Sequence, residues 1–215
     1  MGPPRGTPPG PGFVPREQCW RCRKAREKCV CATVPRVENR TALIVLQHKT
    51  ERRHPLGSVR LLRLGLARAR VEIAFQESVP PLALPAGAAL LYPAPGARDL
   101  ASLGPDERPA ALVVLDGTWS QAKRMFRESP WLQALPRFLV TPRAPGRYRI
   151  RTEPSPRHVS TLEAVVLALL QLEPDTPGLL GLVTAFDQMI EAQVQHMPAE
   201  LRPPPSPPPE RLRGP

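Results

Sequence analysis

The chain has 215 residues and a formal net charge of +11, from 30 Lys and Arg against 19 Asp and Glu. This length supports one well-buried domain with appended segments. No apolar stretch reaches the length of a membrane span, and the first 15 residues lack the apolar core of a signal peptide. We therefore expect a cytoplasmic protein with no membrane segment.

The excess of positive charge favours a polyanionic partner. Nucleic acid fits, an acidic membrane surface would also fit, and heavy arginine usage in a basic proteome is the neutral explanation. Proline and glycine dominate residues 1–15, and proline is frequent in residues 198–215. Neither segment has enough apolar residues for their burial to offset the conformational entropy lost on ordering. Both are therefore predicted to be disordered tails.

Four cysteines follow the pattern C-x2-C-x6-C-x-C, and they are Cys19, Cys22, Cys29 and Cys31. Thiols this close together in a cytoplasmic protein favour a tetrahedral zinc site over a disulfide framework. Because cysteine fills all four ligand positions, the zinc would be structural. Four unligated cysteines are the alternative. The predicted zinc-binding element spans residues 16–36, and one globular domain spans residues 37–197.

Basic residues surround the cysteines, among them Arg23 and Lys24, and Trp20 lies between the first two cysteines. A small basic element with an exposed aromatic side chain is typical of RNA contacts. The alternative is that Trp20 covers the metal site and the basic side chains are simply solvated.

Apolar runs of two different periods alternate through the middle of the chain. Continuous aliphatic and β-branched runs predict five buried strands, at 41–47, 71–75, 88–93, 111–116 and 137–141. Helical spacing predicts four helices, at 58–70, 118–128, 160–173 and about 178–196. Strands that alternate with helices indicate an α/β domain with a mostly parallel sheet and flanking helices.

The fourth predicted strand ends in Asp116, at the kind of strand end where open α/β sheets bind ligands. Gly117 would allow a sharp turn or a close approach to a ligand. Thr118 and Gln121 form a capping-box pattern, and Trp119 could belong to the core. Asp116 is therefore the strongest candidate for chemistry, with a hydrogen bond to loop amides as its alternative role.

The segment LDGTWSQAKRM resembles the D-x-T-W signature of the DTW-domain family. Three further segments resemble family motifs in the expected order, LYP at 91–93, RYRIRTEP at 147–154 and STLEA at 160–164. The four-cysteine cluster resembles the family's N-terminal zinc element, so the resemblance covers roughly residues 19–175. The family's His-Pro loop does not have its usual spacing in this chain. His48 or His54 could be its counterpart, and an ordinary surface side chain is the favoured interpretation of either.

The resemblance implies a SPOUT-like fold with a C-terminal trefoil knot, in which residues 37–197 form the catalytic domain. It also implies that S-adenosyl-L-methionine is the donor substrate and tRNA the partner, with no obligatory protein partner. The implied reaction moves the 3-amino-3-carboxypropyl group to N3 of a uridine, giving acp3U and methylthioadenosine. The implied donor-binding residues are Leu91, Tyr92, Pro93, Asp116, Gly117, Thr118, Ser160 and Thr161.

Three residues are catalytic candidates under this resemblance. Asp116 would contact the uridine N3–H or the amino group of the donor, and Trp119 would wall the pocket or stack on a base. Glu163 is the third, although Ser160 and Glu163 also match a capping box that explains both as a helix start.

Basic side chains supply the predicted RNA contacts. Arginines alternate along the RYRIR stretch, so their side chains would point the same way. They would contact tRNA phosphates or, alternatively, form the solvated face of a strand. The RNA-binding candidates are Arg23, Lys24, Lys123, Arg147, Arg149 and Arg151.

Two other functions remain open. A SPOUT-like RNA methyltransferase would use the same donor, and the mass of the product on uridine separates it from the aminocarboxypropyl reaction. A non-catalytic zinc-containing RNA-binding protein would bind RNA but not S-adenosyl-L-methionine. The D-G-T-W and S-T-L-E-A motifs disfavour the second, because a pure binder has no need of a carboxylate in that turn.

Overall fold

The computed structural model describes residues 17–54, 56–76, 78–143, 146–150, 158–206 and 208–212. The predicted tail at 1–15 and the candidate Arg151 lie outside these residues. The strands are β1 Ala42–His48, β2 Ala69–Ala74, β3 Ala88–Leu91, β4 Arg98–Asp99, β5 Ala111–Asp116 and β6 Arg137–Leu139. The α-helices are α1 Val59–Gly65, α2 Trp119–Arg127, α3 Pro130–Ala134, α4 Thr161–Leu172 and α5 Leu179–Val194. Short 3-10 turns are η1 Arg26–Lys28, η2 Glu51–Arg53, η3 Leu100–Ser102, η4 Pro105–Glu107, η5 Ala199–Leu201 and η6 Pro209–Leu212.

The strands form one sheet in the order β2-β1-β5-β3-β6-β4, and neighbouring strands run parallel. Strand β5 therefore lies inside the sheet between β1 and β3. Gln47 of β1 is opposite Asp116 of β5, and Leu91 of β3 is opposite Val114. The carboxyl ends of these three strands consequently meet at one edge of the sheet. The prediction of an α/β fold with a mostly parallel sheet is confirmed.

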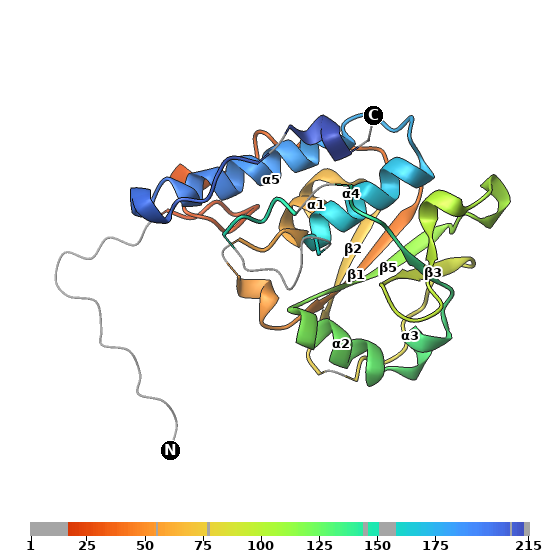
Figure 1. Ribbon diagram of the computed structural model, residues 1–215. Helices are drawn as coiled ribbons and strands as arrows, with labels where there is room; N and C mark the ends of the chain where they lie inside the picture. The colour runs from red at the N-terminus through yellow and green to blue at the C-terminus, as the bar shows by residue number, and fades with distance from the viewer. Residues whose placement is uncertain are drawn as a thin grey trace, which may run out of the picture.

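The sheet is buried on both faces, which makes the domain three layers thick. Along β1, Leu43 and Val45 belong to one apolar cluster and Ile44 and Leu46 to another. Because successive side chains of a strand point to opposite faces, this alternation assigns each cluster to one face. Helices α1, α4 and α5 pack on the first face, and α2 and α3 on the second (Figure 1).

Some predicted boundaries differ from the observed ones. Helix α1 ends at Gly65 rather than at residue 70, because Ala69 and the residues after it pair with β1 as strand β2. A Cβ on Gly65 would lie 2.3 Å from a Leu182 methyl and 2.9 Å from the Pro35 carbonyl oxygen, so glycine allows α1 to pack closely on α5. Strand β4 and helix α3 were not predicted, because each is too short to show a period.

The cysteine element packs beside α1. A bridge between Gln18 and Ala25 closes its turn, and Cys22 is fully buried. Arg63 of α1 donates a hydrogen bond of 3.3 Å to the Arg21 carbonyl oxygen. The element is therefore attached to the main domain at the helix that follows β1.

The C-terminal segment differs from the disordered tail expected for residues 198–215. Over its described residues it forms η5 and η6, and Leu212 is buried in the core. Proline has no backbone N–H, so a proline-rich segment leaves carbonyl groups without backbone donors, and here arginine side chains supply the hydrogen bonds. Arg202 donates to the Met197 carbonyl at 3.0 Å, and Arg149 donates to the Pro204 carbonyl at 2.7 Å.

Within the part of the chain that the structure describes, no helix combines the length and apolar character needed to cross a bilayer.

Candidate functional site

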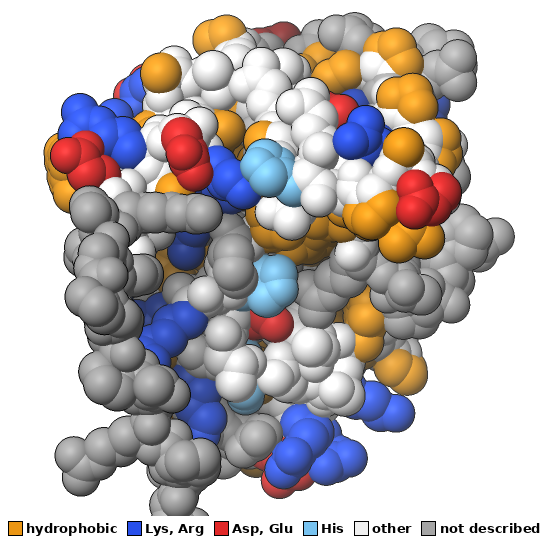
Figure 2. All heavy atoms as spheres, turned by 90° about the vertical axis from the view of Figure 1, so that its left-hand side faces the viewer, with side chains coloured by type: hydrophobic (Ala, Val, Ile, Leu, Met, Phe, Trp, Pro, Cys, Tyr) orange, Lys and Arg blue, Asp and Glu red, His pale blue; other side chains and the backbone are white. Residues whose placement is uncertain are grey.

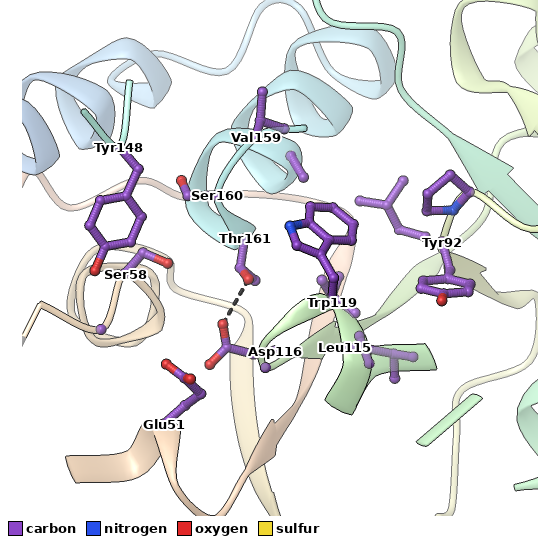
Figure 3. Close-up of a pocket in the computed structure, with 17 residues that line it drawn as sticks. Glu51, Ser58, Tyr92, Leu115, Asp116, Trp119, Tyr148, Val159, Ser160 and Thr161 are labelled. Carbon is purple, nitrogen blue, oxygen red and sulfur yellow. Dashed lines mark hydrogen bonds between the residues drawn. The ribbon is translucent and has the colours of Figure 1, made fainter. Parts of the chain in front are cut away.

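A pocket opens at the carboxyl ends of β3 and β5, and we call it the Asp116 pocket (Figure 3). The space it encloses, counting the open mouth that is continuous with solvent, is about 860 Å³. Its lining comes from five separated parts of the chain. The lining residues are Glu51, Gly57, Ser58, Leu91, Tyr92, Pro93, Val114, Leu115, Asp116, Gly117, Trp119, Ala122, Tyr148, Val159, Ser160, Thr161 and Ala164.

The carboxylate of Asp116 is held between two donors. Gln47 Nε2 donates to Oδ2 at 2.9 Å, and Thr161 Oγ1 donates to Oδ1 at 2.7 Å. Asp116 is 7% exposed, so these bonds are shielded from water and fix the plane of the carboxylate inside the pocket. The alternative role, a bond to loop amides, does not account for these two contacts, which come from side chains on β1 and α4. Glu51 of η2 points into the same pocket (Figure 3).

The turn after Asp116 is fixed by helix capping. Thr118 Oγ1 accepts from the Gln121 amide at 3.3 Å, and Gln121 Oε1 accepts from the Thr118 amide at 2.8 Å. The predicted capping box is therefore present, and Thr118 does not line the pocket. A Cβ on Gly117 would lie 3.0 Å from Gln121 Cβ and 3.5 Å from His48 Cβ, so glycine here allows a close approach of protein side chains.

His48 lies at the end of β1 and is only 4% exposed, so its interpretation as an ordinary surface side chain is wrong. Its Nδ1 is 2.7 Å from Thr50 Oγ1, and Gln121 Nε2 donates to that same oxygen at 3.0 Å. His48 thus belongs to a chain of contacts that ties β1 to the start of α2. His54 is half-buried, and its Nδ1 accepts from the Leu56 amide at 3.3 Å.

Aromatic rings form two walls of the pocket. Trp119 is 39% exposed and meets His158 edge-on, with ring centroids 4.1 Å apart. The Tyr148 hydroxyl donates to the Leu56 carbonyl at 3.0 Å. Burial raises the pKa of Tyr92, so its phenol remains neutral at physiological pH. An indole with an exposed face beside a buried carboxylate is suited to a planar ligand.

Ser160 and Glu163 form the predicted capping box at the start of α4. Glu163 Oε2 accepts from the Ser160 amide at 2.9 Å, and Oε1 accepts from the Arg147 amide at 2.6 Å. Burial raises the pKa of the Glu163 carboxyl, and these hydrogen bonds oppose that shift. Glu163 is fully buried and does not line the pocket. The structure therefore places this catalytic candidate on backbone amides, where it anchors the helix start.

The predicted RNA-binding arginines require a correction. Arg147 is 3% exposed, and its guanidinium pairs with Asp187. Arg149 pairs with Glu191 at 2.7 Å. Both arginines are thus engaged by α5 instead of pointing together toward solvent, and Arg147 is not placed to meet an RNA phosphate. Lys123 is exposed on α2 and does not line the pocket.

The four cysteines converge as a metal site would require. Their sulfur atoms all lie within 4.8 Å of one another, with 3.9 Å between Cys19 and Cys31 and 3.7 Å between Cys22 and Cys29. Zn–S bonds of about 2.3 Å in a tetrahedron give sulfur separations of about 3.8 Å. The backbone amide of Cys22 lowers the pKa of Cys19 to about 6, while burial raises the pKa of Cys31. The cluster could therefore hold a metal ion.

The sequence predicted eight of the residues that line the pocket and missed others, and it also missed Gln47 and His48, which support the site without lining the pocket. Gln47 carries the same signal as Asp116, a polar side chain at the end of an apolar run, and that signal could have identified it together with His48. Tyr148 lies inside the RYRIR segment, whose predicted role rests on its arginines alone. Glu51 and Ser58 carry no local signal, because only the fold brings them to the pocket.

Comparison with known proteins agrees with this geometry. The model of the family described as the DTW domain matches residues 16–194. Two curated relatives are named tRNA-uridine aminocarboxypropyltransferase 2. The one from Macaca fascicularis is 28% identical and the one from Mus musculus 29% identical, each over 193 residues. Each match covers 84% of this chain and 65% of the relative.

A relative of the same name from Drosophila melanogaster is 29% identical over 178 residues, which is 74% of this chain and 69% of the relative. The chain thus spans slightly less than two thirds of the length of the first two relatives. No solved structure shows significant similarity to it.

Proposed function

The chain belongs to the DTW-domain family, and from that premise we propose that it transfers the 3-amino-3-carboxypropyl group of S-adenosyl-L-methionine to N3 of a uridine in tRNA. The products are acp3U and methylthioadenosine. The names of the relatives support the acceptor and the transferred group. One observation carries the proposal. Asp116 of the D-G-T-W turn, Leu91–Pro93 of the LYP segment and Thr161 of the S-T-L-E-A segment line one pocket, although they are distant in sequence.

The reaction requires a proton acceptor beside the uridine. Uridine N3 must lose its proton to become a useful nucleophile, and Asp116 is the carboxylate in the pocket whose position is fixed by two donors. N3 then forms a bond to the donor's methylene carbon, the bond from that carbon to sulfur breaks, and sulfur keeps the electron pair. Which of the three carbons on sulfur reacts depends on which is in line with N3, so orientation within the pocket selects the product.

The pocket residues fit the two parts of the donor. Leu91, Pro93 and Leu115 offer an apolar surface for an adenine ring, and Trp119 is placed to bound the pocket or to stack on the uracil. Helix α4 begins in the pocket at Ser160 and Thr161, and the amino end of a 12-residue helix favours a negative group such as the donor's carboxylate.

Further parts of the proposal concern the rest of the chain. We infer that the four cysteines bind a structural zinc ion, supported by their sulfur separations. We also propose, from the family membership, a SPOUT-like fold with a C-terminal trefoil knot, a catalytic domain over residues 37–197 and a cytoplasmic location.

The test is a transfer assay with a chemically identified product. The full chain is incubated with unmodified tRNA and S-adenosyl-L-methionine labelled in the carboxyl carbon, and the tRNA is digested to nucleosides for mass analysis. Labelled acp3U with equimolar methylthioadenosine supports the proposal. A uridine carrying a single methyl group, or tRNA binding with no donor binding, would instead establish one of the two alternative functions.

A further inference from the structure

A second cavity lies beside the Asp116 pocket and is lined by arginines. The two cavities share Glu51 and Gly57 on their borders. We call the second one the arginine cavity, after its residues Arg23, Arg52, Arg60 and Arg63. Its volume is about 710 Å³ with its open mouth included.

The four arginines converge from three different segments. Arg23 comes from the cysteine element, Arg52 from η2, and Arg60 and Arg63 from α1. They are therefore brought together by the fold and not by a run of basic residues in the sequence. On the face shown in Figure 2, lysine and arginine side chains border a hollow in which histidine and carboxylate side chains are visible.

Within the part of the chain that the structure describes, the four arginines of this cavity have no carboxylate partner, in contrast to other arginines. Arg147 pairs with Asp187 and Arg149 with Glu191. Within the described residues, no carboxylate lies within 4.0 Å of the charged groups of Arg23, Arg52 or Arg60. Cations gathered without counter-charges repel one another until an anion binds.

Arg60 shows this imbalance most clearly. It is half-buried, and burial lowers its pKa. The charges of Arg23 and Arg63 lower the pKa further, while the Cys22 sulfur opposes the shift. An anion bound among these guanidinium groups would relieve both effects.

The positive charge continues from the arginine cavity toward the cysteine element. A third cavity shares Arg23, Arg52 and Arg60 with it and adds Lys24, Lys28 and Arg53. Together the two cavities are lined by seven Lys or Arg residues and one carboxylate, Glu51. A zinc tetrathiolate would carry a charge of about −2, which offsets only part of this excess.

We propose that the arginine cavity binds a backbone phosphate of tRNA next to the uridine that enters the Asp116 pocket. This rests on the proposed function. Guanidinium groups bind phosphate oxygens in pairs, and phosphate contacts set the register of a nucleic acid on a protein. A phosphate held by these arginines lies next to the border that the two cavities share, so the adjoining base is directed toward Asp116. The donor's own carboxylate is the competing anion, and binding measurements separate the two.

The experiment compares tRNA binding and donor binding without turnover. The double variant Arg52→Gln and Arg63→Gln removes two exposed charges and keeps the half-buried Arg60. We expect its Kd for tRNA to rise about tenfold and the slope of log K against log salt to fall by about one to two. Its Kd for S-adenosyl-L-methionine should not change.

The control is Arg98→Gln, which also removes positive charge but lies on β4, at the opposite edge of the sheet from β2. An equal loss of tRNA affinity in the control would overturn the proposal. So would a loss of donor affinity with tRNA affinity retained, because the cavity would then hold the donor's carboxylate. A wild-type protein that modified no uridine would overturn the proposed function alone, since the binding comparison needs no turnover.

A second measurement locates the phosphate. Once the modified uridine is known, RNA is made with an uncharged methylphosphonate on its 5′ or 3′ side. Wild-type protein should bind one of these RNAs about tenfold more weakly, and the double variant should show little further loss, because the two changes remove the same contact. Losses that simply add at both positions would show that the cavity binds elsewhere on the RNA.

Discussion

Gln47 and Asp116 occupy paired positions on neighbouring parallel strands, and the Gln47 amide donates a 2.9 Å hydrogen bond to the Asp116 carboxylate. Thr161 donates to the other oxygen from the first turn of α4. The reactive carboxylate of the proposed mechanism is thus held jointly by the sheet and by a helix on one of its faces. Changes to the carboxylate and to its donors should have different consequences.

Asp116→Asn should abolish most transfer while leaving the fold intact. The amide cannot accept the uridine proton, so we expect kcat to fall about 10²–10⁴-fold. Stability should change by no more than about 1 kcal/mol, because the Thr161 hydroxyl can accept as well as donate a hydrogen bond. Single-turnover assays and thermal unfolding measure the two effects. Full transfer activity in both Asp116→Asn and Asp116→Ala would rule out the assignment.

Thr161→Val should weaken transfer through the orientation of Asp116. Valine has the shape of threonine but no hydroxyl, so the carboxylate loses one of its donors. We expect kcat to fall about tenfold to a hundredfold, with a smaller change in the KM for tRNA. Thr161→Ser keeps the hydroxyl and should recover most of the activity. If serine and valine are equally impaired, the hydroxyl is not what matters at this position.

Glu163→Gln separates the capping role of this residue from a catalytic one. The glutamine side chain has one acceptor oxygen for the two backbone amides that Glu163 accepts from. One buried amide loses its partner, so the free energy of unfolding should fall by about 1–3 kcal/mol. Glu38→Gln, which breaks an exposed ion pair with Arg36, serves as the control and should cost no more than about 1 kcal/mol. Unchanged stability in urea with lost activity would support catalysis by Glu163 instead.

Zinc content should fall as the pH is lowered. The lowered pKa of Cys19, about 6, makes this thiol mostly thiolate at neutral pH and therefore ready to bind metal. Below that pH protons compete with the metal, so zinc should be lost on acidification and retained at pH 7. We expect one zinc ion per chain by elemental analysis and clearly less in Cys19→Ser. Stoichiometric zinc in that variant would argue against the four-cysteine site.

The elements with clear periods could be predicted from the sequence. Strand β5 matches its predicted bounds, and α4 begins and ends within one residue of them. The pattern of the sequence also led to Asp116, because a charged residue that ends an apolar run is unusual. Motif resemblance added Leu91 and Thr161, which no local pattern singles out.

The ion-pair partners of the RYRIR arginines could not be predicted in this way. Alternation suggested that Arg147 and Arg149 share a direction, but their partners, Asp187 and Glu191, lie 40 and 42 positions further along the chain. Those two acids are four residues apart on α5 and so lie on the same helix face. Pairing between distant segments depends on how helices pack on the sheet, and a single sequence does not contain that information in readable form.

The position of β5 inside the sheet has an evolutionary consequence. A strand bordered on both sides by hydrogen-bonded neighbours tolerates little displacement, whereas β2 and β4 each border only one neighbour. Insertions and substitutions can therefore accumulate at the two margins without moving Asp116. Descendants of one ancestral protein can in this way diverge at the margins of the sheet while they inherit an unaltered Asp116 pocket.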